Sequence, residues 1–236
     1  GDSPTVDYLA NYIEAESHAV YAMNIYGSEG LIDGNIIIAN GDYTMGICSM
    51  MMDDVAVITN NDITVNGLKN DTEDVGDMVP VQTVGILAMS ESQIHNNAIT
   101  STGNWTIINT AEDSEITDNY LVSSELMGDD SVDDRSGEAV VENNIPVADA
   151  TNYNLTNDTF FLFFNEEGRL RDNITAESLT FIGEFSDLTL WNVIDRPIKL
   201  LSDNATLYDM SFTITSDNVT VDGFTFVADN SISNVI

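Results

Sequence analysis

The sequence predicts an all-β fold, a right-handed parallel β-helix in which short strands wind into stacked coils. Three observations support this prediction. An asparagine recurs at the same place in a series of similar segments, its spacing is close to the length of one coil, and the segments between show strand-like alternation without sustained helical periodicity. We expect the right-handed sense because parallel connections between strands are almost always right-handed.

The recurring asparagine first stands out in "GLIDGNIII" (30–38), where it interrupts an apolar strand pattern. Four later segments repeat the arrangement, with a β-branched residue three positions before the asparagine and a small residue five positions before it. In the last of them Pro146 breaks the pattern. Together with a weaker copy, "VDYLANYI" (6–13), the segments define these ladder positions: Asn11, Asn35, Asn61, Asn97, Asn119 and Asn144.

A stacked solenoid explains why asparagine returns at one strand position. Asparagine is depleted in strands because a buried amide must find hydrogen-bond partners. In stacked coils, equivalent residues lie about 4.7–4.9 Å apart, so each amide can bond to the amides above and below it. Asparagine also tolerates the left-handed backbone of a tight corner, so we expect the ladder residues themselves to turn the corner. The repeated asparagine is therefore predicted to be structural.

The intervals between ladder positions are 24, 26, 36, 22 and 25 residues. A period in the twenties is typical of a solenoid with one coil per repeat. The long interval contains "GLKNDTEDVGDMVPVQT" (67–83), which is polar and acidic and carries glycine and proline, so it is predicted to be a loop that leaves one corner of a coil.

The pattern changes near residue 146, and we predict two β-helices. Residues 1–145 would form coils with the asparagine ladder, residues 146–185 a connecting and capping segment, and residues 186–236 the start of a second β-helix. "FFLFF" (160–164) would cover the open end of a core. A single solenoid with a bulky excursion is the alternative.

In the last segments apolar residues take the asparagine position. "NATLYDMSFTI" (204–214) and "NVTVDGFTF" (218–226) place two similar corners only 14 residues apart. Either the coils here are smaller or the two corners belong to different sheets. The first residue is not methionine and the last residues follow a strand-like pattern, so we expect a segment of a longer protein.

The charge balance excludes some classes of partner. The chain holds 40 acidic and 6 basic residues, a formal net charge of -34. Nucleic-acid binding through phosphates needs a basic surface, which this composition lacks. Anionic membranes would repel the chain, and no apolar run approaches a membrane span. Cys48 is the only cysteine, which excludes a disulfide scaffold and is typical of a small buried apolar residue.

Seven Asn-X-Ser/Thr sequons favour an extracellular location at a cell surface, with glycans on those that are exposed. They are Asn70, Asn104, Asn154, Asn157, Asn173, Asn204 and Asn218.

Calcium is the one cofactor that the sequence suggests. The segment "GDDSVDDRSGE" (128–138) gathers carboxylates, the oxygen ligands that calcium prefers, and its candidate ligands are Asp129, Asp130, Asp133 and Asp134. The glycine-rich repeat of calcium-binding β-rolls and the EF-hand spacing are both missing. A flexible charged loop that binds no metal is the simpler explanation of the segment, and we predict no other cofactor.

No catalytic residue emerges, although β-helix enzymes that act on polysaccharides are a real alternative. A lyase needs a basic residue beside an acidic cation site, and the only basic candidates are Lys69, Arg135, Arg169, Arg171, Arg196 and Lys199. An inverting hydrolase needs two carboxylates roughly 6.5–9.5 Å apart, and acidic pairs are too common here to single one out. Asp53 and Asp54 beside Asp33 are one such set, and His18 and His95 lie far apart in the sequence.

A binding module is the third possibility. It would use exposed aromatic residues, for which Tyr43, Trp105 and Trp191 are candidates. Each of these is also a common type of core or corner residue.

Four segments carry a family resemblance: "FFNEEGRL" (163–170), "LTFIGEFSDL" (179–188), "DRPIKLLSDNATLYDMSF" (195–212) and "SDNVTVDGFTF" (216–226). With the asparagine coils before them, the chain resembles the adhesin-like surface proteins of methanogenic archaea. The resemblance implies secreted, wall-associated proteins of tandem right-handed β-helix domains that adhere to cells or surfaces, with no catalytic residues to carry over.

We therefore predict a non-catalytic extracellular structural or adhesive protein, part of a cell-surface stalk or of a head-to-tail fibre. Its partners would be further copies of itself, neighbouring β-helix domains of the same protein, or cell-surface glycans and proteins. A carbohydrate-active β-helix enzyme or a carbohydrate-binding module is the alternative.

Overall fold

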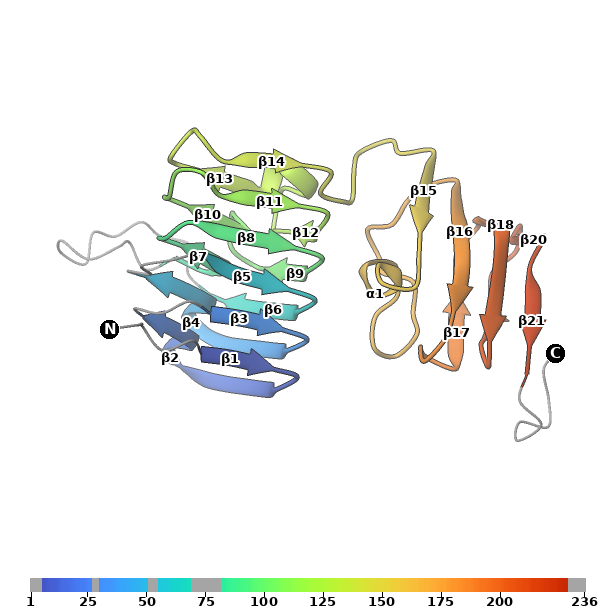
Figure 1. The fold of residues 1–236 in the computed structure, drawn as a ribbon, viewed down its shortest axis with the longest axis horizontal. Helices are drawn as coiled ribbons and strands as arrows, with labels where there is room; N and C mark the ends of the chain where they lie inside the picture. The colour runs from blue at the N-terminus through green and yellow to red at the C-terminus, as the bar shows by residue number, and fades with distance from the viewer. Residues whose placement is uncertain (1–5, 27–29, 51–54, 69–81, 229–236) are drawn as a thin grey trace. The chain divides into compact units, whose positions relative to one another are not determined.

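The computed structural model describes residues 6–26, 30–50, 55–68 and 82–228, and the chain divides into two compact units. Unit 1 comprises Gly1–Pro146 and unit 2 comprises Val147–Ile236. Both are built almost entirely from parallel strands wound as β-solenoid coils, with about 8 turns in all, which confirms the predicted fold class (Figure 1).

The first side of unit 1 is a six-stranded parallel sheet in which each coil adds one strand, in chain order. Its register aligns Ile32 with Ile58, and Ile58 with Ile94, so the sequence repeat and the structural coil coincide. The strands are β1 (Val6–Leu9), β3 (Gly30–Asp33), β5 (Ala56–Thr59), β8 (Ser92–His95), β11 (Glu115–Thr117) and β14 (Val140–Glu142).

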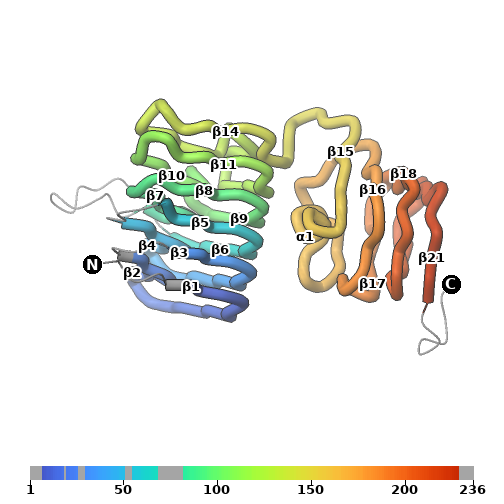
Figure 2. The backbone as a smooth tube through the Cα atoms, viewed as in Figure 1, coloured from blue at the N-terminus to red at the C-terminus, as the bar shows by residue number. Residues whose placement is uncertain are grey.

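The other two sides of unit 1 belong to one eight-stranded parallel sheet, and Figure 2 shows the coils stacked in chain order. In the first two coils a single long strand covers both sides; later coils use two short strands. The strands are β2 (Tyr12–Tyr26), β4 (Ile36–Met50), β6 (Asp62–Gly67), β7 (Val84–Ala88), β9 (Ala98–Ser101), β10 (Ile107–Asn109), β12 (Tyr120–Val122) and β13 (Val132–Asp134).

The register also locates the insertion at 67–83. Gly41 of β4 pairs with Gly67 at the end of β6, and Met45 of β4 pairs with Val84 at the start of β7. The extra residues therefore leave the coil where its second side meets its third, a corner as predicted. Residues 69–81 lie outside the described part of the chain.

The core of unit 1 is a column of inward-facing aliphatic side chains, including Ile37, Ile63 and Ile99, which are all fully buried. A second apolar cluster comprises Met45, Cys48, Val84, Leu87 and Ile108. Cys48 and Leu87 follow inward-facing isoleucines, so strand alternation puts them on the opposite face of the third side. Burial raises the pKa of the Cys48 thiol to about 11, which keeps it protonated at neutral pH.

Unit 2 repeats the architecture with shorter coils. Ser178 pairs with Lys199 and Lys199 with Thr220, a repeat of 21 residues. Its elements are β15 (Asn152–Leu155), α1 (Phe160–Phe163), β16 (Ser178–Phe185), β17 (Trp191–Ile194), β18 (Lys199–Tyr208), β19 (Ser211–Ile214), β20 (Thr220–Asp222) and β21 (Thr225–Val227).

The two similar corners of unit 2 lie at different places on the coil. β18 pairs with β20 through Leu200 and Val221, and with β21 through Leu207 and Phe226. The "LYDM" segment therefore follows the end of β18, whereas "VDGF" ends beside the middle of β18, between the parts that pair with β20 and with β21. Shorter coils and distinct corners both contribute to the spacing that the sequence left unexplained.

The predicted connecting segment 146–185 is not separate from the second β-helix. It contains β15, α1 and β16, and β15 pairs in parallel with β16, so this stretch is the first coil of unit 2. The boundary between the units lies at residue 146, one residue beyond the end predicted for the first β-helix.

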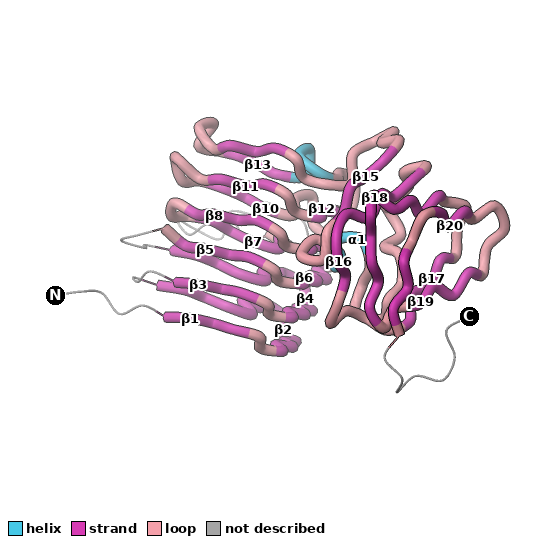
Figure 3. Tube along the Cα trace, turned by 45° about the vertical axis from the view of Figure 1, so that its right-hand side comes forward, coloured by secondary structure: helices cyan, strands magenta, loops and turns pink. Residues whose placement is uncertain are grey.

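The aromatic cluster at 160–164 packs inside unit 2. Phe160 stacks on Phe164 with ring centroids 4.5 Å apart, and Phe160 also meets Phe181 and Phe185 edge-on or tilted. Phe160 lies in α1, the short helix drawn in cyan within unit 2 in Figure 3, and Phe164 directly follows this helix. The FFLFF segment therefore covers the core of its own unit.

Because each unit has its own core, a cavity in one should destabilise that unit selectively. We expect Ile63→Ala to lower the stability of unit 1 by about 2–5 kcal/mol, the usual cost of deleting a buried aliphatic side chain. Hydrogen exchange measured by mass spectrometry would show faster exchange across β4, β6 and β9, with unit 2 unchanged. Phe181→Ala is the matched control and should affect only unit 2. Equal effects on both units would contradict the division.

Candidate functional site

The ladder asparagines form one continuous chain of hydrogen bonds at a buried corner of unit 1. In each rung the main-chain N–H and the side-chain Nδ2 both donate to Oδ1 of the asparagine in the next coil. For Asn97 these distances to Asn119 Oδ1 are 2.9 and 3.0 Å. The same pair of bonds joins the other rungs: Asn11 to Asn35, Asn35 to Asn61, Asn61 to Asn97, and Asn119 to Asn144.

The Nδ2 group of each interior ladder asparagine also donates a hydrogen bond to a main-chain carbonyl of the coil before it. Asn97 Nδ2 also donates to the carbonyl of Ile58 at 2.8 Å, three residues ahead of the previous ladder asparagine. Asn61 does the same to Ile32, at 2.9 Å. Every interior amide therefore bonds to the coils on both sides, which makes the corner a structural element with no free group for a ligand.

The left-handed corner residue is not the ladder asparagine, contrary to the expectation from sequence. Positive φ falls on the residue immediately before it, for example +66° at Gly34 and +53° at Asn96. The ladder residue itself must aim its main-chain N–H at the next coil, so its neighbour makes the turn. The set is Ala10, Gly34, Asn60, Asn96, Asp118 and Asn143. Glycine, asparagine and aspartate dominate it because they tolerate this conformation best.

The acidic loop at 128–138 contributes the last partner of the ladder. Asp129 lies in a 3₁₀ turn (Gly128–Ser131), and its Oδ1 accepts hydrogen bonds from the Asn144 N–H at 3.0 Å and from Asn144 Nδ2 at 2.7 Å. These are the two bonds that a following asparagine would have accepted. Asp129, a candidate calcium ligand, thus has a structural role that sequence spacing did not reveal.

Two more of the candidate calcium ligands have partners within the chain. Asp134 accepts from the Ser136 hydroxyl at 2.6 Å and from Asn109 Nδ2 at 2.9 Å. Partial burial acts to raise the pKa of Asp134, but these bonds, with main-chain N–H donors of Ala139 and Ser136, outweigh it and lower the pKa. Asp133 pairs with Arg135 at 2.7 Å, and Asp130 is exposed. In the described part of the chain, no three histidine, cysteine or carboxylate groups could hold a metal ion together.

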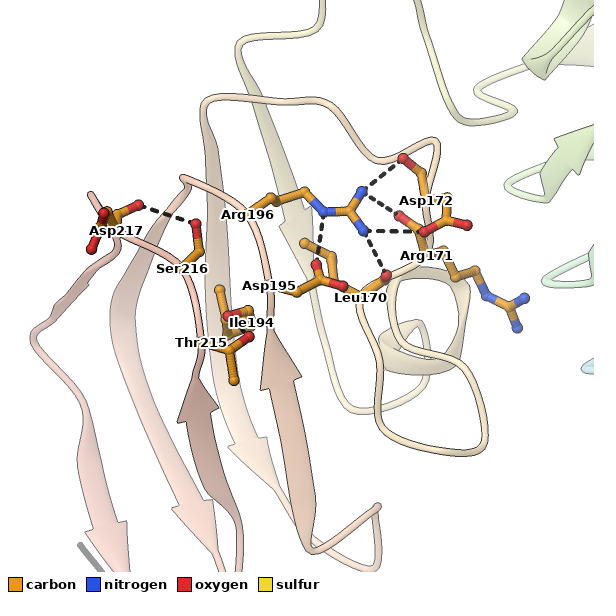
Figure 4. Close-up of polar contacts among 9 residues, drawn as sticks. All are labelled: Leu170, Arg171, Asp172, Ile194, Asp195, Arg196, Thr215, Ser216 and Asp217. Atoms are coloured by element: carbon orange, nitrogen blue, oxygen red, sulfur yellow. Dashed lines mark hydrogen bonds and ion pairs between the residues drawn. The ribbon is translucent and has the colours of Figure 1, made fainter.

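Arg196, whose side chain is 23% exposed, clamps one loop of unit 2 (Figure 4). Nη1 donates to the carbonyls of Arg171 and Asp172 at 3.1 and 2.7 Å, and Nη2 donates to the carbonyl of Leu170 at 3.0 Å. Nε donates to Asp195 at 3.1 Å. With its donors used this way, the guanidinium holds the 170–172 loop against the end of β17.

The other basic candidates are scattered. Arg171 donates to the carbonyl of Phe161, and Arg169 lies 3.5 Å from Glu167. Arg135 pairs with Asp133 in unit 1, and Lys199 is exposed on β18. Lys69, together with Asp53 and Asp54, lies outside the described residues. Arg135, Arg169 and Arg171 therefore each have a partner within ten residues along the chain.

One polar hollow lies on the outer surface of unit 1, where the second side meets the third. Its volume is about 720 Å³, and it crosses three coils. Glu16, Asn40 and Asn66 stack in register along it. His18 Nδ1 lies 2.6 Å from Asp42 Oδ2 at its rim, so the hollow brings His18 beside a carboxylate. His95 lies in β8 on a different side of the coil.

The aromatic candidates differ in exposure. Trp191 on β17 is 55% exposed, whereas Trp105 packs against the second apolar cluster and Tyr43 is half-buried beside His18. Only Trp191 therefore presents a broad surface to solvent among these three.

Most of the described sequons are accessible: Asn104, Asn154, Asn204 and Asn218 are exposed. Asn157 and Asn173 are half-buried, and Asn157 Oδ1 accepts a hydrogen bond from the Ser186 N–H at 2.9 Å. Asn70 lies outside the described residues.

No family model, curated protein or solved structure matches the chain. Among the described residues, no helix is long and apolar enough to cross a membrane.

The ladder can be tested against an isolated asparagine elsewhere in the chain. Asn192 in unit 2 is also fully buried, but its Oδ1 has no hydrogen-bond partner. We expect Asn97→Leu to cost more than about 3 kcal/mol, because each buried group left unpaired costs about 1–3 kcal/mol. Asn192→Leu, the matched control, should cost about 1 kcal/mol or less. Urea unfolding followed by unit-specific hydrogen exchange would measure both. Similar losses would mean that the ladder adds little.

The lowered pKa of Asp134 predicts a pH dependence of stability. A carboxyl whose pKa is lower in the folded state stabilises the fold above its unfolded pKa, and this contribution is lost as pH falls through the folded value. The difference in unfolding free energy between the wild type and Asp134→Asn should therefore be largest at neutral pH. It should shrink as the pH falls below about 4, the unfolded pKa of aspartate. Denaturant titrations at several pH values would measure it. A difference that does not change with pH would contradict this assignment.

Proposed function

We propose that the chain is a non-catalytic extracellular β-solenoid that forms part of a cell-surface stalk with a structural or adhesive role. The observation that carries this proposal is that polar side chains suited to binding a ligand form hydrogen bonds within the chain instead. The corner asparagines, Asp129 and Asp134 hold coils and turns together within unit 1, and Arg196 does so within unit 2. Of these, Asp129 and Asp134 are the groups that the sequence offers as calcium ligands, and Arg196 is one that it offers as a basic residue for catalysis.

The surface chemistry supports the extracellular part of the proposal. Four sequon asparagines are exposed, and the net charge of -34 favours solubility and repulsion between like surfaces. A rigid spacer with an acidic, glycosylated surface suits a stalk that carries adhesive regions away from a cell wall. Its partners would be neighbouring β-helix domains and the glycans or proteins of another surface.

A carbohydrate-binding role is the second candidate, favoured by the polar hollow of unit 1. Stacked side chains of Glu16, Asn40 and Asn66 offer alternating acceptors and donors along three coils, and Asn66 Nδ2 already donates to Asn40 Oδ1 at 2.9 Å. Such an array could bond to successive hydroxyls of a glycan. An enzyme has less support, because the clustered base and cation site of a lyase is not assembled by the described residues.

Native material should distinguish these roles. Glycopeptide mapping should find glycans at Asn104, Asn154, Asn204 and Asn218, and none at the less accessible Asn157 and Asn173. Electron microscopy should show thin rod-like segments whose shape does not change when a chelator is added. Loss of the rods with chelator would assign calcium to the acidic loop. An unglycosylated chain that binds glycans and loses this binding on Asp42→Asn would favour the second candidate.

A further inference from the structure

The polar hollow of unit 1 crosses three coils, and along one side of it lies a polar row formed by Glu16, Asn40 and Asn66. These side chains stack in register on the outer surface. Because stacked strands lie about 4.7–4.9 Å apart, the polar row spans roughly 10 Å. Gly41 follows Asn40 in the hollow, and a Cβ there would clash with the carbonyl oxygen of Ser17. Position 41 must therefore stay without a side chain, which leaves space beside the polar row.

The polar row differs from the buried ladder because its hydrogen-bonding groups are only partly used within the chain. At the ladder residue Asn97, Nδ2 donates to acceptors in the coils on both sides. In the polar row, Asn66 Nδ2 donates to Asn40 Oδ1 at 2.9 Å. Among the described residues no bond joins Asn40 Nδ2 to Glu16, although these two residues are in register. Asn40 Nδ2 therefore remains a donor, while Asn66 Oδ1 and the Glu16 carboxylate remain acceptors.

The fourth coil does not extend the polar row. Thr102 follows Ser101, the registered partner of Val65, so it takes the position equivalent to Asn66. Its Oγ1 accepts a hydrogen bond from the Gly67 N–H and donates one to the Gly67 carbonyl, both at 2.8 Å. This hydroxyl is therefore engaged by the main chain, and Thr102 does not line the hollow.

The other side of the hollow supplies a polar pair and an apolar side chain. His18 and Asp42 come two residues after Glu16 and Asn40, and His18 Nδ1 lies 2.6 Å from Asp42 Oδ2. With Nδ1 engaged in this way, Nε2 is the remaining polar atom of the imidazole. Leu68 lines the hollow in the third coil and is 85% exposed. The hollow therefore combines donors and acceptors with one apolar contact.

These groups decide which class of ligand fits the hollow. The carboxylates of Glu16 and Asp42 line it and the chain has a net charge of -34, so an anionic ligand is repelled. An ammonium group donates hydrogen bonds but accepts none, so it would leave Asn40 Nδ2 without an acceptor. A hydroxyl both donates and accepts, so a chain of hydroxyls can pair with every group of the polar row.

We propose that this hollow binds an uncharged glycan that lies along the stacking direction of the coils. Its successive hydroxyls accept a hydrogen bond from Asn40 Nδ2 and donate to the Glu16 carboxylate and to Asn66 Oδ1. Leu68 contacts the apolar face of a sugar ring. The inference rests on the carbohydrate-binding candidate of the proposed function and names its ligand class.

The test is titration calorimetry of the full chain with neutral trisaccharides of glucose, mannose and N-acetylglucosamine. We expect at least one of them to bind with a Kd of about 1 mM or lower. A trisaccharide of galacturonic acid should bind about tenfold more weakly or worse, because it is anionic. An excess of spermidine, which offers ammonium donors and no hydroxyl, should not displace the neutral trisaccharide.

Matched variants locate the binding. Glu16→Ala removes one acceptor of the polar row, and Asn40→Asp removes its donor while keeping the oxygen that Asn66 uses. Each should weaken binding of the neutral trisaccharide about threefold to tenfold, the effect of one lost hydrogen bond. Glu14→Ala is the control, because Glu14 is exposed on the same strand and does not line the hollow. Urea unfolding should show that all three variants are as stable as the parent.

Several results would overturn the proposal. They are the failure of all three neutral trisaccharides to bind, displacement by spermidine, and equal effects of Glu16→Ala and Glu14→Ala. An acidic trisaccharide that binds as well as the neutral ones and is weakened by Glu16→Ala would keep the carbohydrate-binding candidate and overturn only its uncharged ligand. The stalk role depends on the glycopeptides and rods of native material, so it can fail separately.

Discussion

The fold of unit 1 depends on one constraint: each coil places one asparagine amide at its corner, and that amide must be hydrogen-bonded to the neighbouring coils. An asparagine at an inward corner is unfavourable alone, and it becomes favourable only when the next coil places another asparagine directly above it. This requirement sets the register between coils more strictly than apolar packing can. A slip of one residue would leave Asn61 without Asn97 and would turn Ile63 away from the core.

Unit 2 shows what the same architecture does without the ladder. Its core is held by a chain of aromatic contacts that runs from Phe160 through Phe181 to Phe212 and Phe224. Ring contacts bury large areas but accept several orientations, so they specify register less sharply than paired amides do. Asn192 on β17, a buried asparagine of this unit, pairs with Phe212 of β19 and leaves its Oδ1 without a hydrogen-bond partner. A buried amide without an asparagine in the next coil is therefore less completely bonded than one in the ladder.

The ladder was predictable because its signal is local and repeated. The spacing of the asparagines predicts the length of a coil, and the isoleucines around them predict which face of each strand points inward. The sequence also carries a signal for the left-handed residue, since glycine, asparagine or aspartate precedes most ladder positions, as at Gly34 and Asp118. The first coil of unit 2 resembles a connector in sequence because α1 lengthens it and no copy of the corner asparagine marks it.

The role of Asp129 could not be predicted, because it depends on a turn that returns the chain to the ladder. Asp129 lies 15 residues before Asn144, and neither position resembles a repeat of the other. The acidic loop suggests cation binding, yet its Asp129 carboxylate accepts both hydrogen bonds that the last ladder asparagine donates. An asparagine in place of Asp129 would present two new donors and so require a further acceptor. A carboxylate accepts the same two hydrogen bonds and has no N–H of its own to donate. Whether this one residue is an amide or an acid therefore decides whether the ladder continues or stops.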